Sequence, residues 1–330
     1  MPDAGRQKWI GLDIGGAAIK AATTDGFAAR VPFALWQQPN DLADAVRSLL
    51  ADCPPHDAVA AAMTGELADC FETKQRGVSH IVAAVLEAGA AEARFFTLEG
   101  SFVSAAEATG DWRRVAAGNW AALARAVAPS LLIDIGSTTT DIIAPATLER
   151  TPPPDDTDRL MHGELLYFGV GRTPLCAVVS ALPYRGRACP VAAELFATTG
   201  DAAMLVGEGD TSTESPTADG RPADLAFASA RMARMLCLDP TDFDHEDAVT
   251  AAEHVIGELA RRVGSDVRRV LGDGRGQTVT VSGDGEWLAR RALAACGWCG
   301  EVASLGDRLG PEVSRCAPAW AVAELAERLP

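Results

Sequence analysis

The chain of 330 residues is longer than the roughly 100 to 200 residues of a typical domain, so two domains are expected. With 48% hydrophobic and 22% charged residues, it has the composition of a globular protein and not of a disordered one. The formal net charge of −16 leaves no broad basic surface for a nucleic-acid backbone, which argues against nucleic acid as a partner.

The N-terminal stretch MPDAGRQKWIGLDIGG has no charged region followed by a continuous apolar run. No apolar run elsewhere reaches the roughly 20 residues that span a bilayer, so we expect a cytoplasmic protein without membrane contact. The eight cysteines are scattered, which does not favour a disulfide framework. Cys296 and Cys299 form a C-x-x-C pair. A structural role is favoured over a redox or zinc role, because no second closely spaced pair is present and the surrounding sequence predicts a helix end that leads into a strand.

Taken in chain order, the first part of the sequence alternates strands and helices, which is typical of an α/β architecture with mixed sheets. The stretch KWIGLDIGGAAIKAATTDG (8–26) predicts a strand, a glycine turn and a second strand. A buried strand at 57–67 meets a loop at Thr64-Gly65-Glu66. Apolar spacing predicts helices at 40–53, 77–89 and 119–129, with a strand and its turn at 93–103.

A second strand, glycine turn and strand follows in LLIDIGSTTTDIIA (131–144). We infer an internal duplication. It predicts two related domains, 1–128 and 129–330, that face each other across a cleft, with the terminal helix free to pack back on the first. When the two turns are aligned, Asp13 falls on Asp134, Gly15 on Gly136, Gly16 on Ser137 and Lys20 on Asp141.

Each glycine turn predicts an anion site, because its backbone N–H groups form a nest and glycine lets a phosphate approach closely. Asp13 and Asp134, at the strand ends, suit Mg²⁺, which bridges phosphates through one or two carboxylates. The alternative is that these two acids only cap turns. The predicted phosphate ligands are Gly15, Gly16, Lys20, Gly136, Ser137, Thr138 and Thr139, with the Thr140 hydroxyl as a further donor.

The second half of the sequence contains two further glycine-rich stretches and two polar connections. VTVSGDGEWLARRAL (279–293) predicts a strand, a glycine turn and a helix start that suits a phosphate or a base. In GELLYFGVGRTPL (163–175), Arg172 suits an anion, although an ordinary loop with a surface arginine is equally expected. The predicted pocket residues are Gly169, Gly171, Ser282, Gly283 and Gly285. Exposed connections are predicted at 151–159 and 207–224, the second able to move over a site. Helices are predicted at 225–238, 246–271, 285–296 and 317–329.

Together these motifs resemble the sugar kinase, actin and Hsp70 superfamily, whose signature is two D-x-G phosphate loops and a later adenosine-type glycine turn. The resemblance implies a two-lobed actin-like ATPase (ribonuclease H-like) α/β fold, with duplicated mixed-sheet domains around a central cleft. Within the superfamily the chain is similar to the hydantoinase/oxoprolinase-like group, and more narrowly to proteins of tetrahydromethanopterin-linked one-carbon metabolism. The stretches that carry this similarity, in order, are GLDIGGAAIKAA, MTGELADCF, LLIDIGSTTTDIIA, GELLYFGVGRTPL and TADGRP.

The narrower resemblance implies a transferase of methanofuran-type cofactor biosynthesis. Such an enzyme joins an aminomethylfuran-methyl diphosphate to the phenol of γ-glutamyltyramine, or a related acceptor, as an ether and releases diphosphate. The two loops and Mg²⁺ would then bind the leaving group. A base must take the phenolic proton. Asp141 and Glu66 are the candidates and Lys74 is an outside one, while Asp141 can alternatively tie the hairpin together.

Two other classes of function stay open. An ATP-dependent kinase, or an ATP-driven hydrolase of the hydantoinase/oxoprolinase type, is supported by the glycine turn at Ser282 to Gly285, and only this alternative makes ATP a ligand. A non-catalytic nucleotide-binding protein is disfavoured by the acids present in both loops. The expected partners are a small-molecule diphosphate and a phenolic amine-type acceptor, and a homo-oligomer is left open.

Overall fold

The computed structural model describes residues 7–90, 92–209, 217–272 and 276–329. The chain forms two compact units that each combine separate stretches of sequence. Unit 1 comprises Met1–Leu132, Ile143–Asp158 and Ala303–Pro330, and unit 2 comprises Ile133–Ile142 and Arg159–Val302. The bounds of the two duplicated domains, 1–128 and 129–330, stay a prediction.

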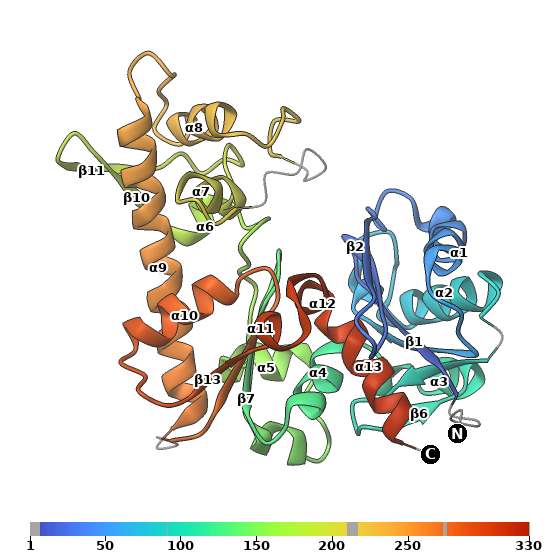
Figure 1. Ribbon diagram of the computed structural model, residues 1–330. Coiled ribbons are helices and arrows are strands. Elements are labelled where there is room, and N and C mark those ends of the chain that lie inside the picture. The colour runs from blue at the N-terminus through green and yellow to red at the C-terminus, as the bar shows by residue number, and fades with distance from the viewer. Residues whose placement is uncertain (1–6, 91, 210–216, 273–275, 330) are drawn as a thin grey trace. The chain divides into compact units, whose positions relative to one another are not determined.

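Unit 1 is built on a six-stranded mixed sheet with the order β3-β2-β1-β4-β5-β6 (Figure 1). β1 pairs antiparallel with β2, which confirms the hairpin predicted at 8–26, and parallel with β4. The carboxyl ends of β1 and β4 therefore meet at one edge of the sheet. The strands are β1 (Trp9–Ile14), β2 (Ala18–Ala22), β3 (Ala28–Pro32), β4 (Ala58–Met63), β5 (Ala93–Phe96) and β6 (Phe102–Val103).

Helices cover this sheet because successive side chains of β1 and β4 point to opposite faces. Ile10, Leu12 and Ile14 belong to one buried apolar cluster, and Ala60 and Ala62 to another. The first cluster includes residues of α1 (Leu42–Asp52), α2 (Lys74–Glu87) and α3 (Ala105–Gly110). The second includes residues of α4 (Asn119–Val127), α11 (Leu305–Leu309), α12 (Pro311–Arg315) and α13 (Ala317–Arg328).

Glycine brings α13 onto β1. A Cβ at Gly11 would lie 1.9 Å from the carbonyl oxygen of Ala319, so no larger residue fits there without moving the helix. The helix predicted at 317–329 is thus confirmed, and it belongs to the same compact unit as the first strand.

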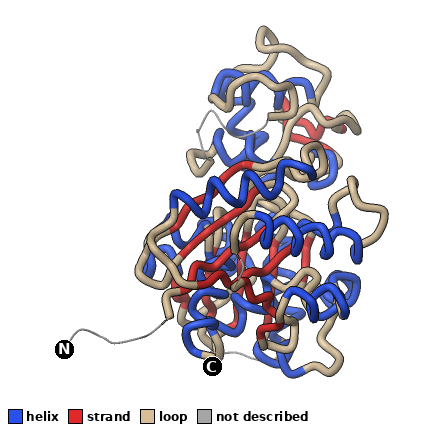
Figure 2. Tube along the Cα trace, turned by 90° about the vertical axis from the view of Figure 1, so that its right-hand side faces the viewer, coloured by secondary structure: helices blue, strands red, loops and turns tan. Residues whose placement is uncertain are grey.

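Unit 2 contains strands of a five-stranded sheet with the order β13-β12-β7-β8-β9 and a separate hairpin of β10 and β11. Figure 2 draws all strands of the chain in red and all helices in blue. The strands are β7 (Leu131–Ile135), β8 (Thr140–Ile143), β9 (Leu165–Leu166), β10 (Ala181–Tyr184), β11 (Arg187–Pro190), β12 (Val279–Ser282) and β13 (Val302–Ser304). The chain crosses between the two units inside β7 and again inside β8.

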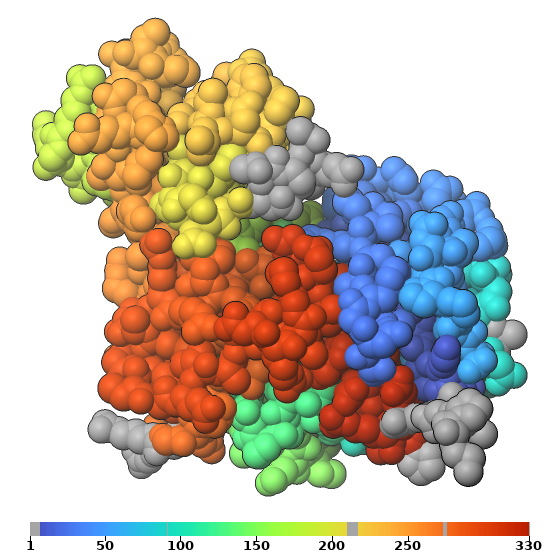
Figure 3. Space-filling view, in the orientation of Figure 1, coloured from blue at the N-terminus to red at the C-terminus, as the bar shows by residue number. Residues whose placement is uncertain are grey.

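The long helix α9 (His245–Leu271) organises the helices of unit 2. A capping box of Asp244 and Asp247 fixes its start. It packs against α10 (Glu286–Ala295), whose outer face lies on the surface in Figure 3, and against α7 (Thr199–Leu205), α8 (Leu225–Arg234) and β10. The helices predicted at 225–238, 246–271 and 285–296 are confirmed.

The connection at 151–159 differs from its prediction as an exposed loop. A helix, α5 (Asp156–His162), begins inside it, and Arg159 is buried. Of the connection at 207–224, residues 210–216 lie outside the described residues. The hairpin of β10 and β11, together with α6 (Leu175–Val178) and α7, was not predicted from the sequence. Among the described residues, none of the helices has the length and apolar composition to cross a membrane.

Candidate functional site

The first glycine turn joins β1 to β2 in unit 1. Gly15 N–H donates to the carbonyl of Ala18 at 3.0 Å and closes the turn. The strand register places buried Asp13 opposite Lys20, and Lys20 Nζ lies 3.9 Å from Asp13 Oδ2. A Cβ added to Gly16 would meet nothing within 4 Å, so this part of the turn is open. The hairpin therefore brings the four predicted residues of the first turn together.

The loop Thr64-Gly65-Glu66 lies beside the first glycine turn, because β4 ends next to β1. Thr64 N–H donates to the carbonyl of Ile14 at 3.0 Å, and a Cβ on Gly65 would lie 3.3 Å from the carbonyl carbon of Gly15. Glu66 itself is only 1% exposed. Its Oε2 has no hydrogen-bond partner among the described residues.

Burial raises the pKa of the Glu66 carboxyl from 4.5 to about 7, although backbone hydrogen bonds from Glu66 and Ala117 oppose the change. The negative charge of Asp156 raises this pKa further, and the positive charge of Lys74 lowers it. Lys74 Nζ lies 3.5 Å from Asp156 Oδ2, so Lys74 forms an ion pair. The pKa of Glu66 therefore lies near neutral pH.

The second glycine turn joins β7 to β8 and repeats the backbone of the first. Gly136 N–H donates to the carbonyl of Thr139 at 2.9 Å. Asp134 Oδ1 accepts a hydrogen bond from Ser282 Oγ at 2.5 Å. The buried Thr140 hydroxyl donates to the carbonyl of Phe168 at 2.8 Å. The prediction of Thr140 as a phosphate donor is therefore wrong, because its hydroxyl is engaged by the neighbouring segment.

The glycines at 169 and 171 support the second turn directly. Val170 N–H donates to the carbonyl of Gly136 at 3.0 Å, and the N–H groups of Gly171 and Arg172 donate to that of Ser137 at 3.0 and 2.9 Å. A Cβ on Gly169 would lie 2.4 Å from the Ser137 carbonyl carbon, and one on Gly171 would lie 2.4 Å from Ser137 Oγ. This stretch thus packs against the second turn and supports it. The side chain of Arg172 is half-buried.

The glycine turn after β12 packs against the end of β7. Gly283 has a φ of +88°, and a Cβ there would lie 2.4 Å from the carbonyl oxygen of Ile135 and 2.8 Å from Asp134 Oδ1. Gly285 N–H donates to the carbonyl of Ile135 at 2.8 Å, just before α10 begins. Three glycine stretches therefore converge on residues 134–138, at the end of β7 and in the second turn.

Asp141 is buried on β8 and forms an ion pair with Arg159 of α5. Arg159 is 2% exposed. The Asp141 carboxylate is therefore already engaged by a buried arginine of its own unit. The structure therefore favours the alternative in which Asp141 ties the hairpin in place over its candidacy as the base.

Comparison with known proteins identifies the family of this chain. Residues 57–328 match the family model described as hydantoinase/oxoprolinase. The chain belongs to the hydantoinase/oxoprolinase family. It is 30% identical over 330 residues to a (4-{4-[2-(gamma-L-glutamylamino)ethyl]phenoxymethyl}furan-2-yl)methanamine synthase of Methanocaldococcus jannaschii, covering 97% of each chain. A Methanococcus vannielii protein of the same name is 30% identical over 200 residues, which are 59% of this chain and 89% of that protein.

The structural comparison bears on the fold alone. The nucleotide-free structure of acetone carboxylase matches with a TM-score of 0.51 at 12% identity, covering 96% of this chain and 70% of that one. With two mixed sheets that each carry helices, this hydantoinase/oxoprolinase family member has the actin-like ATPase fold that the sequence predicts.

No group of three or more His, Cys, Asp or Glu side chains in the described ranges is arranged to hold a metal ion. One carboxylate beside each glycine turn nevertheless fits Mg²⁺, which keeps several waters and arrives with phosphates. Cys296 and Cys299 follow α10 as free thiols, each directed at a backbone carbonyl, of Leu293 at 3.2 Å and of Gly297 at 3.4 Å.

Proposed function

We propose that this protein is a cytoplasmic transferase of methanofuran-type cofactor biosynthesis. It joins an aminomethylfuran-methyl diphosphate to the phenol of γ-glutamyltyramine, or of a related acceptor, and releases diphosphate. The observation that carries the proposal is the 30% identity to the methanococcal synthase over 97% of both chains. Its partners are the two small molecules.

The chemistry consists of one substitution. The bond between the furan-methyl carbon and the diphosphate oxygen breaks, and the phenol oxygen bonds to that carbon. The furan ring spreads the positive charge that develops at this carbon, so the main task of the protein is to bind and neutralise the leaving diphosphate. Backbone N–H groups of the glycine turns, the hydroxyls of Ser137, Thr138 and Thr139, and the Lys20 ammonium suit that task.

Mg²⁺ is the proposed cofactor, and it would supply positive charge to the diphosphate oxygens when bound. Asp13 and Asp134 are the carboxylates proposed to hold it, since each is the acid that precedes a glycine turn. The hydrogen bond from Ser282 orients the Asp134 carboxylate for such a role.

We assign the base to Glu66. A phenol has a pKa of about 10, and a carboxylate with a pKa near 7 takes its proton more readily than an ordinary carboxylate does. Asp141 is bound to Arg159, and Lys74 is bound to Asp156. Both other candidates thus already serve as ion-pair partners.

A second candidate function is ATP-dependent chemistry, as in a kinase or a hydantoinase/oxoprolinase-type hydrolase. The observation that favours it is the glycine turn at Ser282 to Gly285, which lies between β12 and α10 and contacts Asp134 and Ile135. A helix start beside a carboxylate suits a nucleotide, and a furan diphosphate offers no adenosine for it.

Calorimetric titration of the purified protein with Mg²⁺ separates the two functions. Tight binding of diphosphate, with weak binding of a non-hydrolysable ATP analogue, supports the transferase. The synthetic furan-methyl diphosphate and γ-glutamyltyramine should then give the ether by mass spectrometry, together with one diphosphate per ether. Preference for the ATP analogue and no ether would overturn the proposal in favour of the ATP-dependent function.

A further inference from the structure

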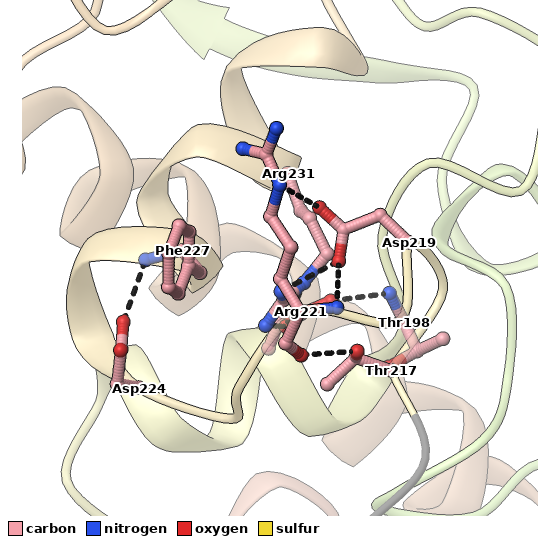
Figure 4. A network of polar contacts seen from close by, with 8 residues as sticks. Thr198, Thr217, Asp219, Arg221, Asp224, Phe227 and Arg231 are labelled. Carbon is pink, nitrogen blue, oxygen red and sulfur yellow. Dashed lines mark hydrogen bonds and ion pairs between the residues drawn. The ribbon is translucent and has the colours of Figure 1, made fainter.

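A buried arginine in unit 2 lies outside the residues assigned to the reaction. Arg231 of α8 is 0% exposed. Its Nε donates to Asp201 Oδ1 at 2.8 Å, and its Nη1 donates to Asp219 Oδ1 at 3.0 Å; Figure 4 shows this network. Burial acts to lower the pKa of Arg231, but the hydrogen bonds and charges of the two carboxylates outweigh burial and raise it. Arg231 is therefore a fixed cation between two chain segments.

The contacts on the Asp201 side connect Arg231 to the second glycine turn. Asp201 belongs to the first turn of α7, and its Oδ2 accepts from the N–H of Thr198 at 2.9 Å. Thr199, which follows Thr198 in the chain, donates its hydroxyl hydrogen to the carbonyl of Gly169 at 2.7 Å. Gly169 in turn packs against the backbone of Ser137. A continuous series of polar and packing contacts thus runs from Arg231 to the second glycine turn.

On its other side, Arg231 binds Asp219, which orders a surface turn at 217–221 within the TADGRP stretch. Asp219 Oδ1 also accepts from the N–H of Arg221 at 3.2 Å, and the hydroxyl of Thr217 donates to the carbonyl of Arg221 at 2.6 Å. Burial raises the pKa of Asp219, but the hydrogen bonds from Arg221 and Arg231 outweigh it, so the pKa lies below its usual value. Asp219 therefore stays charged and holds the 217–221 turn on Arg231.

We propose that Arg231 is a positioning residue that holds the second glycine turn and the 217–221 turn on one buried support. A buried ion pair is costly to break because the remaining partner is left uncompensated, so such a network fixes the positions of the segments that it joins. The inference rests on the proposed binding of a phosphate-containing ligand at the second turn, and it holds for diphosphate and for ATP alike.

The test is the Arg231→Lys variant of the full chain, measured by hydrogen exchange. Lysine keeps the charge but lacks the planar fork that reaches two carboxylates at once. We expect backbone amides at 136–140 and 169–172 to exchange at least about tenfold faster, while those in the middle of α9 (255–263) keep their wild-type rates. Affinity for diphosphate with Mg²⁺ should fall at least about fivefold by calorimetry.

Two further variants separate the contribution of Asp219 from that of Asp201. Asp219→Asn should speed exchange at 217–221, with a smaller effect at 136–140, and it serves as the test if Arg231→Lys does not fold. Asp224→Asn is the matched control. It removes one negative charge from the same loop, does not involve Arg231, and keeps a good helix cap for the N–H of Phe227, so wild-type values are expected.

Each result decides the inference. Wild-type exchange at 136–140 in Arg231→Lys overturns it, and so does equally faster exchange at 255–263, because Arg231 would then only stabilise the fold. If the wild-type protein binds an ATP analogue and not diphosphate, the transferase proposal fails by itself. A loss of analogue affinity in Arg231→Lys would still support the positioning role.

Discussion

The two glycine turns share a backbone but differ in their support. In each, the glycine N–H donates to the carbonyl three residues later, from Gly15 to Ala18 and from Gly136 to Thr139. The first turn is open at Gly16, where an added Cβ would meet nothing. The second is backed by the 169–172 stretch, with an approach so close that only glycine fits at 169. The first turn is backed too, because the carbonyls of Gly16 and Ala17 accept from the N–H groups of Leu35 and Phe33 at 3.0 Å, so the two turns differ in how closely the supporting segment approaches.

The acids beside the two turns also differ, in the charge of the group next to each. Asp13 lies 3.9 Å from the ammonium of Lys20, whereas Asp134 accepts a short hydrogen bond from the hydroxyl of Ser282. One acid is next to a cation, and the other is oriented by a neutral donor. The comparison teaches that duplication of a turn preserves its backbone, while neighbouring segments within each unit set the electrostatics of its acid.

The largest effect is expected from Asp134→Asn. The amide oxygen can still accept from Ser282, so the fold should persist, but the negative charge proposed for Mg²⁺ is lost. Turnover should fall at least about 1000-fold, or roughly 4 kcal/mol, in an assay of diphosphate release. Asp13→Asn, measured in parallel, shows whether the acids share the role equally. Wild-type turnover of Asp134→Asn, with unchanged circular dichroism, would remove the proposed metal role.

The next largest effect should come from Gly169→Ala. The new Cβ would lie 2.4 Å from the backbone of Ser137, so the second turn must move. We expect the free energy of unfolding to fall by about 3 kcal/mol in urea titrations. Gly16→Ala is the matched control in the first turn, where the new Cβ would meet nothing within 4 Å, and it should change the free energy of unfolding by less than about 0.5 kcal/mol. Similar losses in both variants would contradict the difference in support.

Glu66→Gln should change how stability depends on pH. The folded state raises the pKa of Glu66 from 4.5 to about 7, so the folded protein binds the proton more tightly than the unfolded chain does. The wild-type protein therefore loses stability as pH rises from about 4.5 to about 7, by up to roughly 3 kcal/mol from this group.

Thermal unfolding of both proteins across pH 4 to 8 is the measurement. The stability of Glu66→Gln relative to wild type should increase through this window and level off above about pH 7. In the transferase assay, the wild-type rate should fall below about pH 7 as Glu66 takes up a proton. A constant stability difference from pH 4 to 8 would show that Glu66 has an ordinary pKa.

The smallest effect is expected from Lys20→Ala. Loss of one charged hydrogen bond should weaken diphosphate binding by roughly 1 to 3 kcal/mol in calorimetry with Mg²⁺. Lys8→Ala is the control, because Lys8 is an exposed lysine of the same unit. Unchanged affinity in Lys20→Ala would mean that Lys20 only compensates the charge of Asp13.

Much of this architecture was predictable from the sequence, because local patterns determine it. The Asp-x-Gly motifs at Asp13 and Asp134 predict both hairpins, and apolar periodicity predicts α9. Glycines 169, 283 and 285 were recognised by type and proved to pack against residues 134–138. Periodicity and turn residues report what a segment does with its own neighbours, and these features depend on little else.

The ion pairs of the buried arginines were not predictable. Arginine is mostly exposed, so neither Arg159 nor Arg231 carries a local sign of burial. Their partners, Asp141 and Asp201, lie 18 and 30 residues away in sequence. Only the folded chain brings each pair together, which is why the sequence predicts an exposed loop at 151–159 and leaves Asp141 as either a base or a tie of the hairpin.

The close packing of Gly11 against Ala319 has a consequence for synthesis on the ribosome. Chains are made from the N-terminus, so β1 emerges early, whereas α13, which covers one of its faces, emerges only after the whole of unit 2. Until then the part of the first sheet that α13 covers, over β1, β2 and β4, is uncovered and prone to association. Unit 1 is thus completed only after unit 2 has been made, and nascent chains that stall before residue 317 should be clients of molecular chaperones.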